Sequence, residues 1–328
     1  MKITWYYIGA WSLLLLTVLA SLLLGAGNLP LEEAFSVLAG QGTAEARFVV
    51  MELRMPRLAI GLVTGLSLGI AGALLQTLTR NPLAEPGLLG VSAGSSFAVS
   101  LAILFGASTA TLTTMVAQAG AFAGCGLVIA ATRIQGVGQD PVRLVLAGAT
   151  LTGLLLSLSS LLMLMDQRAA DEIRFWITGS IAGKNWDQLL ATLPTMLLAG
   201  ALVIGLVKPL ASLALGEKVA TGLGHHPGRT RLMVIVAVAL LVGGATALAG
   251  PLVFVGLVVP FAARALVGAD IRKTLWFCLP IGPAIIIGAD TLSRLLVSPS
   301  EMPLGVITAL IGAPVLMVII RTRRIPTL

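Results

Sequence analysis

Ten long apolar runs are the feature that most restricts what this chain can fold into. A helix needs about 20 predominantly apolar residues to cross the hydrocarbon core of a bilayer. Runs close to that length occupy residues 6–25, 58–78, 88–105, 109–131, 142–165, 189–207, 232–250, 251–267, 275–296 and 304–320. The sequence therefore predicts an all-α polytopic membrane protein with about ten transmembrane helices. We expect residues 1–328 to form a single transmembrane domain.

The composition excludes the other broad classes of chain. Of the 328 residues, 57% are apolar and 11% are charged, against roughly 25% charged in soluble domains. A folded soluble chain could not cover its surface with so few charges, and disordered chains combine low hydrophobicity with high charge. Cys125 and Cys278 lie inside apolar runs, so we interpret them as buried side chains rather than a disulfide or a metal site.

Three of the runs are open to a second interpretation. Gly250-Pro251 joins two runs that form either one long hairpin or a span followed by a half-helix. Such a break is tolerated at membrane depth only beside protein or a wet cavity. The first run resembles a secretory signal, but residues 6–24 are longer than a signal core and lack a small-x-small cleavage pattern. We therefore expect a retained first span.

The positive-inside rule orients the spans. With a cytoplasmic N-terminus and ten crossings, 14 of the 21 Lys and Arg residues fall on the inner side, but only 4 of the 14 acidic residues do, counting Asp290 as outer. Both termini are therefore expected in the cytoplasm. The net charge of +7 reflects this topology, since the basic residues are spread over inner loops, and we expect no nucleic-acid partner.

Ionisable residues are nearly absent from the middle of the spans. Asp290 and Arg294, four residues apart, are the main exception, and they form either an ion pair near the outer surface or part of a functional site. Ion-coupled transporters and charged-ring channels need ionisable groups at membrane depth, so their scarcity argues against self-powered transport. Closely spaced glycines in the second run indicate helix packing rather than a ligand site: Gly61, Gly65, Gly69 and Gly72.

Arg54 and Arg57 flank Met55-Pro56 on the predicted outer side. Because a proline disfavours the helical conformation in the residue before it, we expect Met55 to be non-helical and both arginines to lie at a helix start. The helix dipole disfavours cations there. An acidic group, either a lipid headgroup or a protein partner, should compensate them; simple anchoring at the membrane interface is the alternative.

Two inner loops carry candidate functional segments. Residues 80–87, Arg-Asn-Pro-Leu-Ala-Glu-Pro-Gly, form a rigid connector that suits either a gate or an ordinary turn. Residues 208–231 contain a segment at 211–220 that predicts a short amphipathic helix, a surface for another protein. His225 and His226 do not share a helical face, so we expect no metal site. With no phosphate loop, paired metal-ligand histidines or nucleophile constellation, we expect no catalytic residue and no cofactor on this chain.

Several of these segments together resemble the FecCD permease family. They are residues 54–57, 69–76 and 80–94 in the first half and, in the second half, residues 250–260, Arg264, Gly268, Asp290, Arg294, 301–305 and 312–314. The resemblance covers residues 45–320. One departure is Phe261 after Pro260, where the family commonly has histidine.

The resemblance implies the type II ABC importer architecture in a bacterial cytoplasmic (inner) membrane. Two permeases, identical or paralogous, would enclose one pathway, with two ATPases that hold ATP and Mg on the inner side and an extracytoplasmic binding protein outside. It assigns binding-protein docking to Arg54, Arg57 and Arg294, and the inner gate to Asn81, Pro82 and Leu83. It assigns ATPase coupling to residues 208–231 through Leu215, Gly216, Glu217, Ala220, Gly222 and Gly224.

The cargo that the resemblance favours is an iron(III)–siderophore complex, because residues 168–181 are most similar to siderophore-type members. Haem and cobalamin are the alternatives. An ion-coupled secondary transporter and a membrane scaffold for a soluble enzyme are the hypotheses from other classes. Neither the particular siderophore nor the identity of the partner permease follows from the sequence.

Overall fold

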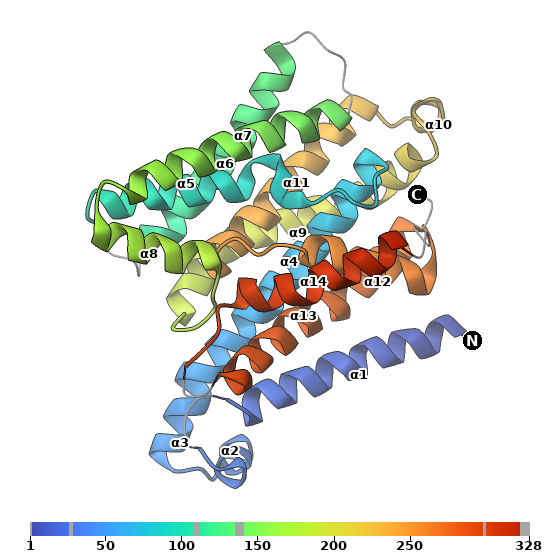
Figure 1. The fold of residues 1–328 in the computed structure, drawn as a ribbon. Coiled ribbons are helices and arrows are strands. Elements are labelled where there is room, and N and C mark those ends of the chain that lie inside the picture. Colours follow the sequence, from blue (N-terminus) through green and yellow to red (C-terminus); the bar gives the residue numbers. More distant parts are fainter. Residues whose placement is uncertain (1, 26–28, 108–111, 135–140, 298–299, 322–328) are drawn as a thin grey trace.

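Each of the ten apolar runs coincides with a helix in the computed structural model (Figure 1), which describes residues 2–25, 29–107, 112–134, 141–297 and 300–321. These helices are α1 (Lys2–Leu23), α4 (Met55–Thr79), α5 (Val91–Leu104), α6 (Leu112–Ile134), α7 (Pro141–Met163), α9 (Trp186–Ala214), α11 (Pro227–Ala249), α12 (Val255–Val267), α13 (Ile271–Leu296) and α14 (Leu304–Arg321). In the described residues, seven helices are long and apolar enough to cross a membrane, and α5, α12 and α14 supply shorter apolar helices. The prediction of about ten transmembrane helices is confirmed.

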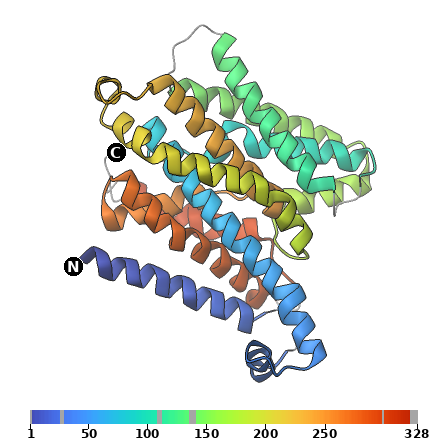
Figure 2. The ribbon, with the colours of Figure 1, turned by 180° about the vertical axis from the view of Figure 1, so that it is seen from behind.

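Shorter elements connect these helices: α2 (Leu31–Leu38), α3 (Ala44–Phe48), η1 (Val49–Arg54), η2 (Pro86–Leu89), α8 (Gln167–Thr178) and α10 (Glu217–Gly222). Helix α4 runs through the bundle, with Arg57 near its start and Arg80 at its end. We call the two ends of the molecule the Arg57 end and the Arg80 end. The elements α2, α3 and α8 lie at the Arg57 end. Helix α10, the start of α1 and the end of α14 lie at the Arg80 end (Figures 1 and 2).

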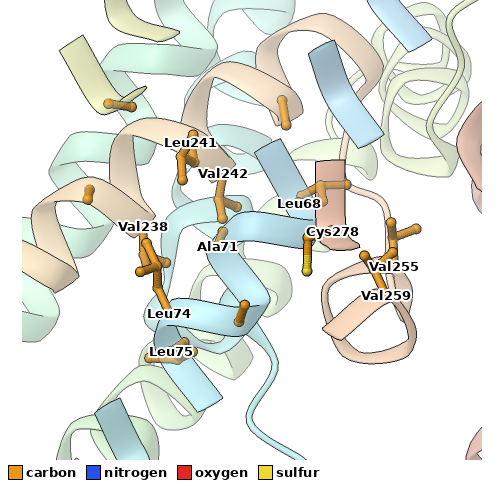
Figure 3. Close-up of a cluster of buried hydrophobic side chains, with 14 of the residues drawn as sticks. Leu68, Ala71, Leu74, Leu75, Val238, Leu241, Val242, Val255, Val259 and Cys278 are labelled. Carbon is orange, nitrogen blue, oxygen red and sulfur yellow. The ribbon is translucent and has the colours of Figure 1, made fainter. Parts of the chain in front are cut away.

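Helix α4 is enclosed by α11, α12 and α13, because it carries apolar side chains on every side. Figure 3 shows this core, in which α4 meets α11 on one side and α12 with α13 on the other. The labelled side chains are Leu68, Ala71, Leu74 and Leu75 of α4, Val238, Leu241 and Val242 of α11, Val255 and Val259 of α12, and Cys278 of α13.

The glycines of α4 make this close packing possible. A Cβ added at Gly65 would lie 2.4 Å from the carbonyl oxygen of Gly282, and one added at Gly72 would lie 1.7 Å from that of Gly256. Backbones can approach this closely only where no side chain intervenes. The interpretation of these glycines as a packing surface is confirmed.

The helix that carries Arg54 and Arg57 differs from the prediction. Met55 is helical (φ −65°, ψ −48°), and one helical segment runs from Ala44 to Thr79 through α3, η1 and α4. The π-helix η1 ends directly before Met55-Pro56. Its wider turn accommodates the proline, which has no N–H and would clash with the carbonyl four residues earlier in a regular helix. The arginines therefore lie within a continuous helix and not at its start.

Helices α5, α6 and α7 form a second packed group beside α11 (Figure 1). Glycine again permits two helix backbones to lie close together. A Cβ added at Gly94 of α5 would lie 2.3 Å from the carbonyl oxygen of Gly120 on α6. Helix α8 packs against α5, α7 and α14 at the Arg57 end. This arrangement leaves the space between α14 and the second group that forms the candidate site.

Candidate functional site

A cavity of about 760 Å³ lies between α14 and the α5–α7 group. Helix α14 lines it with one face from Gly305 to Met317, which is about 18 Å of helix. The rest of the lining is mostly apolar and comes from the loop before η2, from η2, α5, α7 and α8, and from the segment between α11 and α12: Glu85, Gly87, Leu88, Ser92, Ala93, Ser96, Thr152, Leu156, Ile177, Thr178, Pro251, Leu252 and Val253. The cavity therefore extends from the Arg57 end toward the Arg80 end.

The break between α11 and α12 forms one wall of the cavity. Helix α11 ends at Ala249, Gly250 has φ 72°, and α12 begins after Phe254, a non-glycine residue with φ 68°. The Gly250-Pro251 feature is therefore a span followed by a shorter helix, and the alternative of one long hairpin is wrong. Non-helical backbone is tolerated here because protein packs against it and it borders a cavity.

Backbone contacts fix this wall to its neighbours at the Arg57 end. The Ser180 N–H donates to the carbonyl of Ala249 at 2.8 Å, and the Gly305 N–H donates to the carbonyl of Gly179 at 3.4 Å. A Cβ added at Gly250 would lie 2.9 Å from the Cα of Gly179. Three glycines thus bring the end of α8, the break and the start of α14 together.

Among the residues that the structure describes, Glu85 is the only ionisable one in the lining of this cavity. Its side chain makes no hydrogen bond or ion pair with any described residue. Burial raises the pKa of the Glu85 carboxyl to about 7, because the charged form loses hydration. An unpaired carboxyl with a shifted pKa in a cavity is typical of a functional position.

A cluster of charged side chains lies at the Arg57 end. The Arg57 guanidinium pairs with Asp290 at 2.7 Å and with Glu301 at 2.9 Å. Asp290 also pairs with Arg294, one turn later on α13, at 3.1 Å, and these two side chains are only 3% and 2% exposed. Of the two interpretations of Asp290 and Arg294, the ion pair is present in this structure, and a functional role stays a prediction. The pair is buried and belongs to a network that joins α4, α13 and the residues before α14.

The other two arginine contacts hold the end of α1. The Arg54 Nη1 donates to the carbonyl of Leu22 at 2.7 Å, and the Arg294 Nη2 donates to the hydroxyl of Ser21 at 2.9 Å. Cations are favoured at this end of a helix, where carbonyls lack intrahelical partners. Arg54 and Arg294 are both buried. In this structure the acidic partners of Arg57 belong to its own chain, and the docking role of Arg54, Arg57 and Arg294 stays a prediction.

A second hollow, of about 490 Å³, also lies at the Arg57 end. It is bounded by α8 and by the residues before α9, and its charged lining residues are Asp171, Glu172 and Lys184. Burial lowers the pKa of Lys184 because it disfavours the ammonium form. Phe175 and Trp176 lie beside these charges. The hollow offers both signs of charge next to aromatic surface.

The loop at the Arg80 end turns tightly. Arg80 ends α4 in the left-handed conformation (φ 50°), and the side-chain oxygen of Asn81 accepts the Leu83 N–H at 2.9 Å. The Arg80 Nη2 donates to the carbonyl of Leu213, at the end of α9, at 2.9 Å. Asn81 and Leu83 are exposed and Pro82 is half-buried. The gate role of Asn81, Pro82 and Leu83 stays a prediction.

The predicted short helix at 211–220 is wrong in its bounds. Helix α9 continues past Pro209 to Ala214, because Leu210 and Leu213 are buried in the core. Gly216, with φ 124°, then separates α9 from α10. The left-handed backbone at this position is open to glycine without steric cost, which is why the chain turns there.

Helix α10 and its flanks present an apolar surface at the Arg80 end. Leu215, Val219 and Leu223, four residues apart, are 74%, 44% and 62% exposed. Glu217 forms an ion pair with Arg231 of α11. Of the predicted coupling residues, Ala220 is buried, Gly216 is half-buried, and the others are exposed: Leu215, Glu217, Gly222 and Gly224. Their coupling role stays a prediction.

The sequence pattern did not identify Glu85 or the contact made by Arg80. The sequence did contain one signal for Glu85. The predicted inner side holds 14 basic residues and only 4 acidic ones, and Glu85 is one of those 4. The Arg80 contact joins residues 133 positions apart, so no local pattern reveals it. No group of three His, Cys, Asp or Glu side chains that could hold a metal ion occurs among the described residues.

Comparisons with known proteins agree with this geometry. A sequence model of the FecCD transport family matches residues 13–322. The ferric enterobactin transport system permease protein FepD of Escherichia coli (strain K12) is 45% identical over 316 residues, which cover 95% of this chain and 94% of FepD. The Fe(3+)-citrate import system permease protein YfmD of Bacillus subtilis (strain 168) is 32% identical over 304 residues, 93% of this chain and 90% of YfmD.

A solved structure described as an inward-facing conformation of a metal-chelate type ABC transporter has the same fold. It superposes with a TM-score of 0.84 at 31% identity and covers 97% of this chain and 99% of that chain. This chain therefore belongs to the FecCD transport family and has the fold of an ABC importer permease.

Proposed function

We propose that this chain is the membrane subunit through which an ATP-driven importer carries iron(III)–siderophore complexes. The main support for this proposal is the cavity of about 760 Å³ that runs along α14. Its volume lies in the range of small-molecule sites, and its mostly apolar walls would hold a passing chelate weakly. Similarity to permeases named for ferric enterobactin and iron citrate supports an iron chelate as the cargo.

We assign the Arg80 end to the cytoplasm of a bacterial inner membrane. The basic residues that the positive-inside rule counts lie mostly at this end, including Lys208, Lys218, Arg229, Arg272 and Lys273. Three charged residues that were counted on the inner side lie outside the described residues: the acidic Asp140 and the basic Arg323 and Arg324. Both ends of the described chain are at the Arg80 end (Figure 1). The Arg57 end then faces the outer compartment.

A second permease, an identical copy or a paralogue, would complete the pathway. The lining of the cavity includes large apolar side chains that remain substantially exposed in the single chain: Leu156, Val253, Leu310 and Met317. Contiguous exposed apolar surface of this kind is typical of an interface. The energy would come from two separate ATPases with their ATP and Mg. The scarcity of ionisable residues in the described lining of the cavity supports an external energy source.

The apolar surface of α10 suits the docking of such an ATPase. Leu215, Val219 and Leu223 would fill an apolar groove, as amphipathic helices commonly do. The Arg80–Leu213 hydrogen bond connects the base of this surface to the loop at 80–85 that borders the cavity. We infer that Arg80 transmits movement of α10 to the proposed gate at Asn81–Leu83.

The Arg57 end suits the docking of an acidic binding-protein surface. Arg57 has a 12% exposed side chain, and the hollow with Lys184 lies at the same end. To dock, Arg54, Arg57 and Arg294 would give up contacts within this chain. They would instead contact acidic side chains of the binding protein.

ATP dependence tests the proposed function. The complete transporter in proteoliposomes, supplied with binding protein outside and ATP inside, is expected to take up a radiolabelled iron(III)–siderophore complex. Uptake should stop when ATP or the binding protein is omitted, and a proton or sodium gradient should not replace ATP. Gradient-driven uptake by this chain alone would sink the proposal in favour of a secondary transporter.

The hydrogen bond from Arg80 to Leu213 leads to a prediction about the coupling of ATP hydrolysis to uptake. Arg80→Gly removes the guanidinium, but glycine suits the left-handed end of the helix. The variant should therefore fold, and the transporter that contains it should hydrolyse ATP. Uptake per ATP should fall by about tenfold or more, since a hydrogen bond from a charged donor contributes roughly 1.5–3 kcal/mol. Arg80→Lys, which keeps the charge, should lie in between. The measurement is uptake and ATP hydrolysis in the same vesicles; a normal ratio in Arg80→Gly contradicts the link.

The docking role predicts a loss of affinity in Arg57→Gln. The variant keeps the Asp290–Arg294 pair and avoids placing a like charge beside Glu301. The dissociation constant for the binding protein should rise about tenfold or more, measured by surface plasmon resonance. Arg272→Gln, which removes an exposed charge at the Arg80 end, is the control and should bind as the wild type does. Equal affinity of all three proteins would show that Arg57 takes no part in docking.

A further inference from the structure

The polar side chains at the Arg80 end of the cavity have no partners within the described chain. Glu85, Ser92 and Thr152 line this end. The Thr152 hydroxyl is buried without a hydrogen-bond partner, and the Glu85 carboxyl and Ser92 hydroxyl have none among the described residues. In the same lining, the hydroxyls of Ser96 and Thr178 donate to carbonyls of their own helices. The first three groups are therefore the ones left for a ligand.

Local packing gathers these three groups around η2. A Cβ added at Gly87 would lie 4.0 Å from the Cγ of Glu85 and 3.7 Å from the Oγ of Ser92. Helix α7 packs onto η2 at Gly148, where an added Cβ would lie 1.8 Å from a carbonyl oxygen of η2. Thr152 lies one turn further along the same side of α7. The groups thus come from three elements and face one region of the cavity.

No cation compensates Glu85 among the described side chains. The helices packed against η2 are α4, α5, α6, α7, α11 and α12, the last through Gly256 against Pro86. Their titratable and charged residues are Arg57, Arg80, Cys125, Arg133, Arg143, Arg229, Arg231 and Arg264. Arg57, Arg80, Arg231 and Arg264 have partners elsewhere. Arg229 is exposed and Cys125 is a buried thiol, while the side chains of Arg133 and Arg143 lie outside the described residues. Burial therefore raises the fraction of Glu85 that carries a proton, to about half at neutral pH.

A neutral carboxylic acid and two hydroxyls all supply hydrogen-bond donors. An anionic oxygen is the acceptor that suits such a set, and hydrogen bonds to ionised acceptors are roughly twice as strong as neutral ones. We propose that Glu85, Ser92 and Thr152 form a binding site for an anionic oxygen of the cargo chelate, with Glu85 as a protonated donor. The inference rests on the proposed function and adds to it a preference for anionic over cationic chelates.

Uptake at two pH values tests the site. The complete transporter is assayed as wild type, Glu85→Gln and Glu85→Leu, with a trianionic ferric tris-catecholate as the probe and the same pH on both sides of the vesicle. Glutamine keeps a donor of similar size that does not titrate, whereas leucine removes it. With a pKa of about 7, the protonated fraction of Glu85 falls about tenfold between about pH 6 and about pH 8. The ratio of wild-type to Glu85→Gln uptake should fall by the same factor, and Glu85→Leu should be slow at both pH values.

Dividing by the Glu85→Gln rate removes any pH effect on the ATPases or the binding protein. If Glu85→Leu fails to fold, Thr152→Val, which keeps the shape and loses the hydroxyl, should still lower uptake severalfold. A ratio that stays constant with pH overturns the site, as does normal uptake in both Thr152→Val and Glu85→Leu. Loss of ATP-driven uptake in every protein, including the wild type at about pH 6, would instead overturn the proposed function.

Discussion

The need to pair every backbone N–H and C=O group at membrane depth explains the fold and the position of the cavity. Each N–H and C=O group there needs a partner within the protein, so the apolar runs fold as helices. Residues 250–254 depart from helical geometry between α11 and α12, and they do so where they border the cavity. Phe254 is held in the left-handed conformation against Gly312, where an added Cβ would lie 2.3 Å from the Cβ of Phe254. The break and the cavity are therefore one structural feature.

Among the described residues, charged side chains gather toward the two ends of the molecule, because burying an ion away from water is costly. A buried ion is tolerated only when it is paired and hydrogen-bonded, and the network of Arg57, Asp290, Arg294 and Glu301 meets that requirement inside the chain. Glu301 lies just before α14, which lines the cavity. Under the proposed function, a binding protein that competes for Arg57 would act on the start of a cavity wall. Glu85 lacks such pairing, which is why the cavity's own chemistry centres on it.

Periodicity and length were sufficient to predict the helices, because membrane spans leave a strong local signal. The packing of the α4 glycines could also be predicted, since their spacing is local. The spacing of Asp290 and Arg294 indicated an ion pair as one of two interpretations. The helical Met55 could not be predicted, because the π-turn before Pro56 overrides the usual effect of proline. Nor could the extension of α9 to Ala214, which depends on tertiary burial of Leu213. The cavity and the Arg80 contact join residues distant in sequence, so only the folded chain shows them.

Labelling of α14 by a water-soluble thiol reagent tests whether cargo passes along the cavity. Cys125 and Cys278 are buried, so introduced cysteines can be followed in the full transporter. Ala309→Cys and Ala313→Cys place thiols on the cavity face, and Ile311→Cys places one on another face of the same helix. If cargo passes there, it should protect the first two cysteines from labelling. Labelling either of them should block uptake, whereas labelling Ile311→Cys should leave uptake unchanged. Undiminished uptake after complete labelling at Ala309→Cys and Ala313→Cys would contradict passage of cargo along the cavity.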